Sequence, residues 1–219
     1  FMPGHWMAMN TANSTVVLKG VPTTEPVFKL PATWVDEVER RNAEMAGYTV
    51  VDASSVLVTH LSESIRRHAY QILTRQDVQV LVDNLKDDHP ALVNELVPNL
   101  LNIGQIQRIL QNLLSEVIPI RNLVGILERV ADHAPATKNP DELSEQARRV
   151  LGSEIVKPFL SDENEVRAVT MEPWLEEEIA KGLQKSATES ILFMEPKLAQ
   201  HMTHHLATAV QPMIASGQQ

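Results

Sequence analysis

The feature that most constrains the fold is the spacing of apolar residues between Thr74 and about Gly152. Apolar side chains recur there every three or four residues, the period at which one face of an α-helix repeats. In residues 103–116 they are Ile103, Ile106, Ile109, Leu110, Leu113 and Leu114, and in 121–135 they are Leu123, Ile126, Leu127 and Val130. Because the connections between these helices are short, we expect antiparallel neighbours. The spacing therefore predicts a helical bundle.

Capping residues mark where several of these helices begin and end. Thr74 is expected to cap the helix over 75–88, with Asp77 as its acidic partner three residues on. Pro98 ends a short helix that starts near residue 89. Asn139-Pro140 opens another helix, with proline at the first helical position.

The segment before the bundle predicts a small α/β unit. Residues 1–31 are rich in Pro, Gly, Asn and Thr, which indicates loops and short strands, one of them in STVVLKG over 14–20. Pro31 fits the first turn of a helix that runs over 32–47 and closes at Gly47. A strand over 47–52 follows, and then a helix capped by Asp52 or Ser54.

The segment after Lys157 predicts a second α/β unit. VRAVTM (166–171) alternates like a strand, EPWLEEEIAKGLQ (172–184) is helical, ESILFM (189–194) is strand-like, and a long helix covers 195–216. The fold class is therefore α+β and mainly α-helical, with a small α/β unit, a central helical bundle and a C-terminal α/β unit. The predicted domains are 1–73, 74–156 and 157–219, and we expect the last to be truncated.

Composition excludes several function classes. The formal net charge is -9 and no basic run occurs, so neither nucleic acid nor an anionic membrane surface is an expected partner. The absence of cysteine excludes disulfides and thiolate chemistry. No apolar run approaches the roughly 20 residues that cross a bilayer, and no secretory signal is present. Phe1 is not a natural translation start, so we expect a piece of a longer protein.

Three histidines near the C-terminus are the strongest candidates for metal chemistry. His201 and His205 are four residues apart and so share a helix face with the spacing of a metal pair, and His204 is adjacent. Met202 stands where a zinc protease of the HExxH type carries its general base. With eight glycines, phosphate-binding loops are hardly available. We expect no enzyme, metal or cofactor, and keep a metal-dependent hydrolase as the alternative from another class.

The stretch TTEPVFK (23–29) is a candidate binding surface. An exposed Phe28 beside the Glu25 carboxylate, on a turn stiffened by Pro26, would be a pre-organised anchor for a partner. An apolar face of a partner helix could lie on such a surface. The alternative is that Phe28 belongs to the core and pins the loop, while Glu25 is solvated.

Several long motifs together resemble one family. MPGHWMAMN, PTTEPVFKLPATWV, GYTVVDASSVLVTHLSESIRRHA and LVPNLLNIGQIQRILQNLLSEVIPIRNLVGILERVADHAPATKNPDEL occur in this order. They resemble the cytoplasmic domain of the flagellar type III export-gate protein, the FlhA or FHIPEP family, over most of residues 2–156. Residues 157–219 resemble the family's more variable last subdomain.

The resemblance implies a docking platform that is not an enzyme. It implies a nine-membered cytoplasmic ring at the inner membrane that receives export chaperone–substrate complexes and passes the substrates to the membrane gate. The implied partners also include other gate subunits and an ATPase complex, and the implied membrane part precedes this segment. Two alternatives remain open: a virulence-type secretion gate of the same family, and a ring scaffold that binds no chaperone.

The resemblance also implies a chaperone-binding site. The family's Asp-Pro-x-Phe turn corresponds to Glu25-Pro26-Val27-Phe28, and its helix threonine to Thr59. Val51 and Val56 complete the implied apolar floor. Glu25 is one methylene longer than the family's Asp. Lys29 replaces a glycine, which adopts positive φ more cheaply, and Lys29 could also pair with Glu25.

Overall fold

The structure is a computed structural model that describes residues 1–12, 14–166, 168–186 and 190–215. The chain divides into two compact units, residues 1–68 and residues 69–219. Each unit is described by itself.

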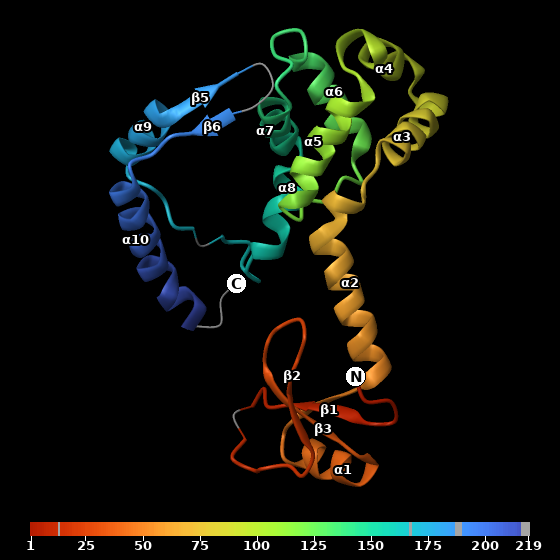
Figure 1. The fold of residues 1–219 in the computed structure, drawn as a ribbon, viewed down its shortest axis with the longest axis vertical. Coiled ribbons are helices and arrows are strands. Elements are labelled where there is room, and N and C mark those ends of the chain that lie inside the picture. Colours follow the sequence, from red (N-terminus) through yellow and green to blue (C-terminus); the bar gives the residue numbers. More distant parts are fainter. Residues whose placement is uncertain (13, 167, 187–189, 216–219) are drawn as a thin grey trace. The chain divides into compact units, whose positions relative to one another are not determined.

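The first unit is built on a four-stranded antiparallel sheet (Figure 1). The strand order is β2-β3-β1-β4, with β1 paired to both β3 and β4. The strands are β1 (Trp6–Met9), β2 (Val21–Thr24), β3 (Pro31–Val35) and β4 (Thr49–Asp52). The helices are α1 (Glu37–Met45) and the start of α2 (Ala53–Ile72).

Both faces of this sheet are covered. On one face Met7 and Trp34 pack with Val56 from the first turn of α2. On the other face Ala8 and Val35 pack with Ala43 of α1. Because neighbouring strand residues point to opposite faces, one short strand supplies both cores.

Two predictions for this unit were wrong. Residues 31–35, predicted as helix, form β3, and the helix begins only at Glu37, where the Asp36 side chain accepts from the Glu39 amide over 2.8 Å. Pairing with β1 and β2 outweighs the helix signal of Pro31. Residues 14–20 contain no strand; Val17 is 90% exposed and has no packing to favour one. The strand predicted over 47–52 is confirmed at Thr49–Asp52, and the predicted helix end at Gly47, which has φ +83°, is also confirmed.

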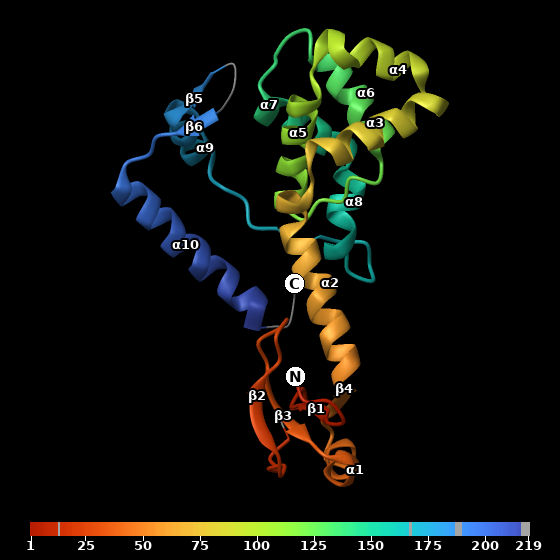
Figure 2. The same ribbon diagram turned by 45° about the vertical axis from the view of Figure 1, so that its right-hand side comes forward.

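The predicted helical bundle is confirmed in the second unit. Its helices are α3 (Arg75–Asp88), α4 (Pro90–Glu95), η1 (Leu96–Leu100), α5 (Ile103–Ser115), α6 (Leu123–His133), α7 (Pro140–Val150), α8 (Gly152–Val156) and η2 (Lys157–Phe159). Figure 2 shows α5, α6 and α7 packed together with α3 and α4. One core cluster contains Ile106, Ile109 and Leu110 of α5 and Ile126 and Val130 of α6, all fully buried. Thr74 and Asp77 form the predicted capping box.

The C-terminal segment differs from the predicted strand–helix–strand–helix order. It contains α9 (Pro173–Gly182), β5 (Leu183–Lys185), β6 (Ser190–Leu192) and α10 (Pro196–Ala215), and β5 and β6 form an antiparallel hairpin. Of the strand predicted at 166–171, the described residues 166 and 168–171 form none; Val166, Val169 and Met171 are exposed and have no strand beside them. The α+β, mainly helical class is confirmed, and the three-domain division remains a prediction.

Candidate functional site

The turn between β2 and β3 is fixed by one buried acid. Glu25 is only 4% exposed, and its Oε2 accepts hydrogen bonds from the amides of Val27, over 2.9 Å, and Phe28. The Glu25 amide donates to the Leu30 carbonyl over 2.8 Å, and the Lys29 amide donates to the Glu25 carbonyl over 3.1 Å. The main chain and side chain of Glu25 therefore close the turn together.

The side chain of Phe28 leaves this turn toward solvent. It is 66% exposed although it is a large apolar ring. The next residue, Lys29, has φ +60°, in the left-handed region that favours glycine, and its Nζ donates to the Pro26 carbonyl over 2.8 Å. Lys29 thus has the backbone conformation that a glycine at this position would adopt.

The alternative of a core Phe28 and a solvated Glu25 was wrong, because the two residues have the opposite environments. The suggested pairing of Lys29 with Glu25 was also wrong. Among the residues that the structure describes, the Lys29 ammonium donates to the Pro26 carbonyl and forms no ion pair with Glu25. The Glu25 carboxylate bonds to backbone amides and the Lys29 ammonium bonds to a backbone carbonyl, so each side chain has a backbone partner within the turn.

The other predicted site residues have different environments. Val56 is 4% exposed and belongs to the core cluster with Met7 and Trp34, and Val51 is half-buried against the same cluster. Thr59 is exposed on α2, one turn after Val56. The structure therefore brings Glu25 and Phe28 together in one turn, and Val51 and Val56 together in one core.

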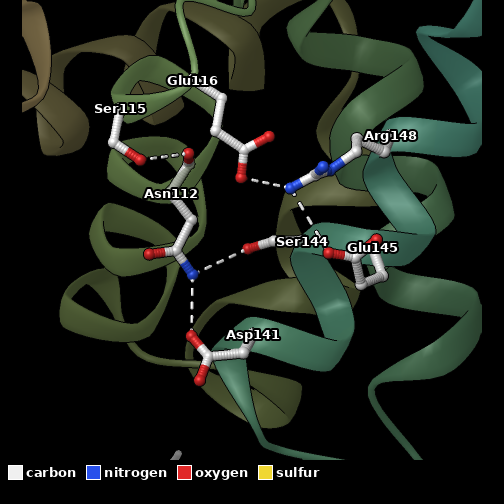
Figure 3. A pocket seen from close by; sticks show the side chains of 7 residues that line it. All are labelled: Asn112, Ser115, Glu116, Asp141, Ser144, Glu145 and Arg148. Atoms are coloured by element: carbon white, nitrogen blue, oxygen red, sulfur yellow. Dashed lines mark hydrogen bonds and ion pairs between the residues drawn. The ribbon is translucent and has the colours of Figure 1, made fainter. Parts of the chain in front are cut away.

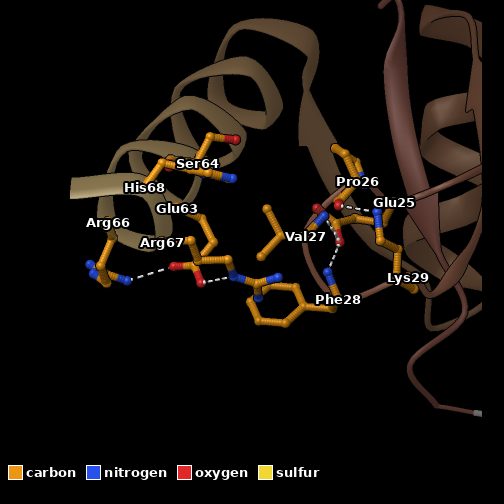
Figure 4. A network of polar contacts seen from close by, with 10 residues as sticks. All are labelled: Glu25, Pro26, Val27, Phe28, Lys29, Glu63, Ser64, Arg66, Arg67 and His68. Atoms are coloured by element: carbon orange, nitrogen blue, oxygen red, sulfur yellow. Dashed lines mark hydrogen bonds and ion pairs between the residues drawn. The ribbon is translucent and has the colours of Figure 1, made fainter. Parts of the chain in front are cut away.

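A charged group on α2, which sequence reasoning missed, faces the turn (Figure 4). Glu63 accepts from Arg66 and from Arg67, each over 2.7 Å, and the bond from Arg67 is the main cause that lowers the pKa of the Glu63 carboxyl. Figure 4 shows the Phe28 ring and the Arg67 side chain directed toward the same space between the turn and the helix. The sequence ESIRR (63–67) could have predicted this group, because Glu63 is three residues from Arg66 and four from Arg67, the spacing of ion pairs on a helix.

A polar hollow of about 230 Å³ lies between α5 and α7 (Figure 3). Its lining residues are Asn112, Ser115, Glu116, Asp141, Ser144, Glu145 and Arg148. Arg148 pairs with Glu116, and Asn112 donates to Asp141 over 3.0 Å and to Ser144 over 3.1 Å. These bonds connect α5 and the residue after it to α7. The polar groups of the hollow therefore stabilise the packing of the two helices.

Comparison with known proteins shows the family. The family model described as "FHIPEP family" matches residues 1–219. The chain belongs to the FHIPEP family. This confirms the resemblance found in the sequence motifs.

Relatives of this FHIPEP chain include two flagellar biosynthesis proteins FlhA. The Bacillus subtilis protein is 37% identical over 209 residues, which cover 95% of this chain and 31% of the relative. The Escherichia coli K12 protein is 36% identical over 200 residues, which cover 91% of this chain and 28% of the relative. The chain therefore spans less than one third of the length of these relatives.

Solved structures share the fold. The Chlamydia pneumoniae CdsV protein matches with a TM-score of 0.78 at 22% identity, over 95% of this chain and 60% of CdsV. The nonameric SctV-C of EPEC matches with a TM-score of 0.71 at 19% identity, over 94% of this chain and 63% of SctV-C.

Three histidines of α10, namely His201, His204 and His205, lie close together. The His201 and His205 rings lie edge-to-face with centroids 5.9 Å apart, and the His204 and His205 rings 5.8 Å apart. Among the described residues, no group of three or more His, Asp or Glu side chains could hold a metal ion. The hydrolase alternative thus has no support in this FHIPEP chain. In the part of the chain that the structure describes, no helix combines the length and the apolarity that a membrane crossing requires.

Proposed function

We propose that this FHIPEP chain is part of the cytoplasmic ring of the flagellar type III protein export gate and docks export chaperone–substrate complexes. The observation that carries the proposal is the Phe28 ring, which is 66% exposed on a turn held rigid by the buried Glu25. An apolar residue that protrudes from a fixed turn loses little conformational freedom on binding. Phe28 is therefore the proposed anchor of the docking site.

The proposed contact surface extends from the turn onto α2. Thr59 is exposed on this helix and offers a hydroxyl, and Val51 is partly exposed at the end of β4. Val56 supports the surface from below, because it lies in the core and cannot touch a partner. An amphipathic helix of a chaperone could place its apolar face on Phe28 and its polar edge toward Thr59.

The flagellar branch is favoured over the virulence branch by sequence. The relatives that support this choice are named flagellar biosynthesis protein FlhA and are 37% and 36% identical to the chain. We place the chain at the cytoplasmic face of the bacterial inner membrane, in a protein that is anchored in the membrane by another part. Delivery of substrates to the membrane gate would follow docking.

The proposed partners also include further copies of the chain, other gate subunits and the export ATPase complex. The solved SctV-C relative is described as nonameric, and another solved relative is a complex of CdsV with CdsO from Chlamydia pneumoniae. These descriptions concern the relatives and support a ring and an additional protein partner here.

The proposal is tested by calorimetric binding of a purified flagellar filament-type chaperone–substrate complex to the wild-type chain and to Phe28→Ala. Loss of a buried Phe contact worth about 2 kcal/mol weakens binding more than tenfold. Phe159→Ala is the matched control, because Phe159 is also an exposed phenylalanine, at 54%. Its affinity should equal that of the wild type.

Unchanged binding in a folded Phe28→Ala variant would remove Phe28 from the docking site. No binding by the wild-type chain would favour the scaffold alternative or a cargo of the virulence branch. Circular dichroism of each variant establishes that it is folded.

A further inference from the structure

We propose that Glu25 is a positioning residue that braces the docking turn from inside and does not present its charge to the partner. The partner would then recognise an apolar surface at Phe28 without placing a cation against Glu25. This inference rests on the proposed docking function. It reverses the expectation that a carboxylate beside an exposed aromatic ring contacts the partner directly.

The first argument is that the Glu25 carboxylate is already occupied. Its Oε2 accepts from the amides of both Val27 and Phe28, and the residue is only 4% exposed. A partner cation that took Oε2 for itself would have to open the turn. Opening would leave two backbone amides without their acceptor, so an ion pair to a partner would gain little.

The second argument is the backbone around the same residue. The Glu25 amide and carbonyl bond to Leu30 and Lys29, so the main chain on both sides of the acid is fixed as well. Figure 4 shows the carboxylate folded back toward the amide of Phe28, whose ring points away. The orientation of the ring thus depends on where the carboxylate holds the Phe28 amide.

The third argument links the two departures from the family's turn. Lys29 holds φ +60° where a glycine is expected, and its Nζ bonds to the Pro26 carbonyl over 2.8 Å. Glu25 stands where an aspartate is expected, and its side chain accepts from the amides two and three residues on. Two side chains therefore bond to backbone groups of the turn, in which Lys29 holds a conformation that glycine adopts more cheaply.

The inference is tested without a partner by amide hydrogen exchange of Val27 and Phe28, measured by NMR. In Glu25→Gln both amides should stay protected, because a single oxygen accepts both bonds and glutamine supplies one. In Glu25→Ala both amides should exchange at least tenfold faster. Glu95→Gln, at an exposed acid of α4, is the control for the loss of one negative charge.

Binding of the same chaperone–substrate complex completes the test. Glu25→Gln and Glu95→Gln should bind within twofold of the wild type, and Glu25→Ala should bind at least fivefold more weakly. Recovery of binding in the neutral glutamine variant distinguishes a brace from a charge that contacts the partner.

Two results would overturn the inference. If Glu25→Gln loses binding while both amides stay protected, the charge itself recognises the partner. If Glu25→Ala keeps the protection of both amides, the turn does not need the brace. Loss of binding only in Phe28→Ala leaves the docking function intact. A wild-type chain that binds nothing defeats the docking function, while the exchange data still decide whether Glu25 braces the turn.

Discussion

The side-chain amide of Asn139 donates a hydrogen bond to the backbone carbonyl of Ser186 over 2.8 Å. The oxygen of the same side chain accepts from the Asp141 amide over 2.9 Å and so caps α7. Asn139 is fully buried, and the Ser190 amide in turn donates to the Asp141 carboxylate over 2.9 Å. The start of α7 therefore holds both ends of the connection between β5 and β6.

This arrangement predicts that the two roles of Asn139 can be separated. Asn139→Ser keeps a capping oxygen but removes the amide donor to Ser186. We expect the hairpin over 183–192 to exchange its amide hydrogens faster, while α7 keeps its protection. Asn139→Ala should lose the cap as well, with about 1 kcal/mol of additional destabilisation. Hydrogen exchange by mass spectrometry and urea unfolding measure the two effects, and equal exchange in α7 for both variants would contradict the separation.

A second prediction contrasts Val56 with Phe28. Val56→Ala removes two methyl groups from a core position that is 4% exposed, so it should lower the free energy of unfolding by about 1–2 kcal/mol. Phe28→Ala should change it by less than about 0.5 kcal/mol, because the ring is mostly in solvent. Chemical denaturation of both variants gives the two values. A larger loss for Phe28→Ala would mean that the ring packs against the protein.

The helical bundle could be predicted from the sequence because its signals are local. The apolar period of Ile106, Ile109 and Leu110 and the Thr74–Asp77 capping box depend on residues within one or two turns. Strand β3 could not be predicted in the same way. The burial of Trp34 depends on pairing with Met7, which lies far away in the sequence.

The candidate site was predicted only in part. The resemblance to the family identified the turn and its residues, but the exposure of Phe28 and the burial of Glu25 depend on which amides lie within reach of the carboxylate. Val56 was assigned to the apolar floor although it lies in the core, because the first turn of α2 faces the sheet. Sequence spacing gives the face of a helix but not the neighbour that covers it.

A third prediction concerns acid stability. The Asp77 carboxylate accepts hydrogen bonds from the Thr74 hydroxyl and from the Thr74 backbone N–H. These bonds, the first more than the second, lower the pKa of the Asp77 carboxyl in the folded chain. A lowered pKa stabilises the fold above the ordinary value of 3.8, and this contribution is lost as the pH falls through the folded pKa. In Asp77→Asn the free energy of unfolding should therefore decrease less at acidic pH than it does in the wild type.

Urea midpoints at pH 7 and pH 3 measure this effect. The decrease from pH 7 to pH 3 should be smaller in Asp77→Asn than in the wild type. Asp87→Asn, at an exposed acid near the end of the same helix, serves as the control and should keep the wild-type decrease. An equal decrease in Asp77→Asn and the wild type would show that the capping box does not contribute to acid sensitivity.

The fourth prediction uses the positive φ of Lys29. A side chain in the left-handed region costs roughly 1–2 kcal/mol, which glycine avoids. Lys29→Gly also loses the exposed bond to the Pro26 carbonyl and gains freedom in the unfolded chain, which together offset part of the gain. We expect a net stabilisation of about 0.5 kcal/mol.

Lys29→Val should destabilise the chain by about 1–2 kcal/mol, because a β-branched residue tolerates this conformation poorly. Urea unfolding of the three proteins should therefore rank glycine above lysine and lysine above valine, and a valine variant as stable as the wild type would show that the turn can adopt another backbone conformation without cost.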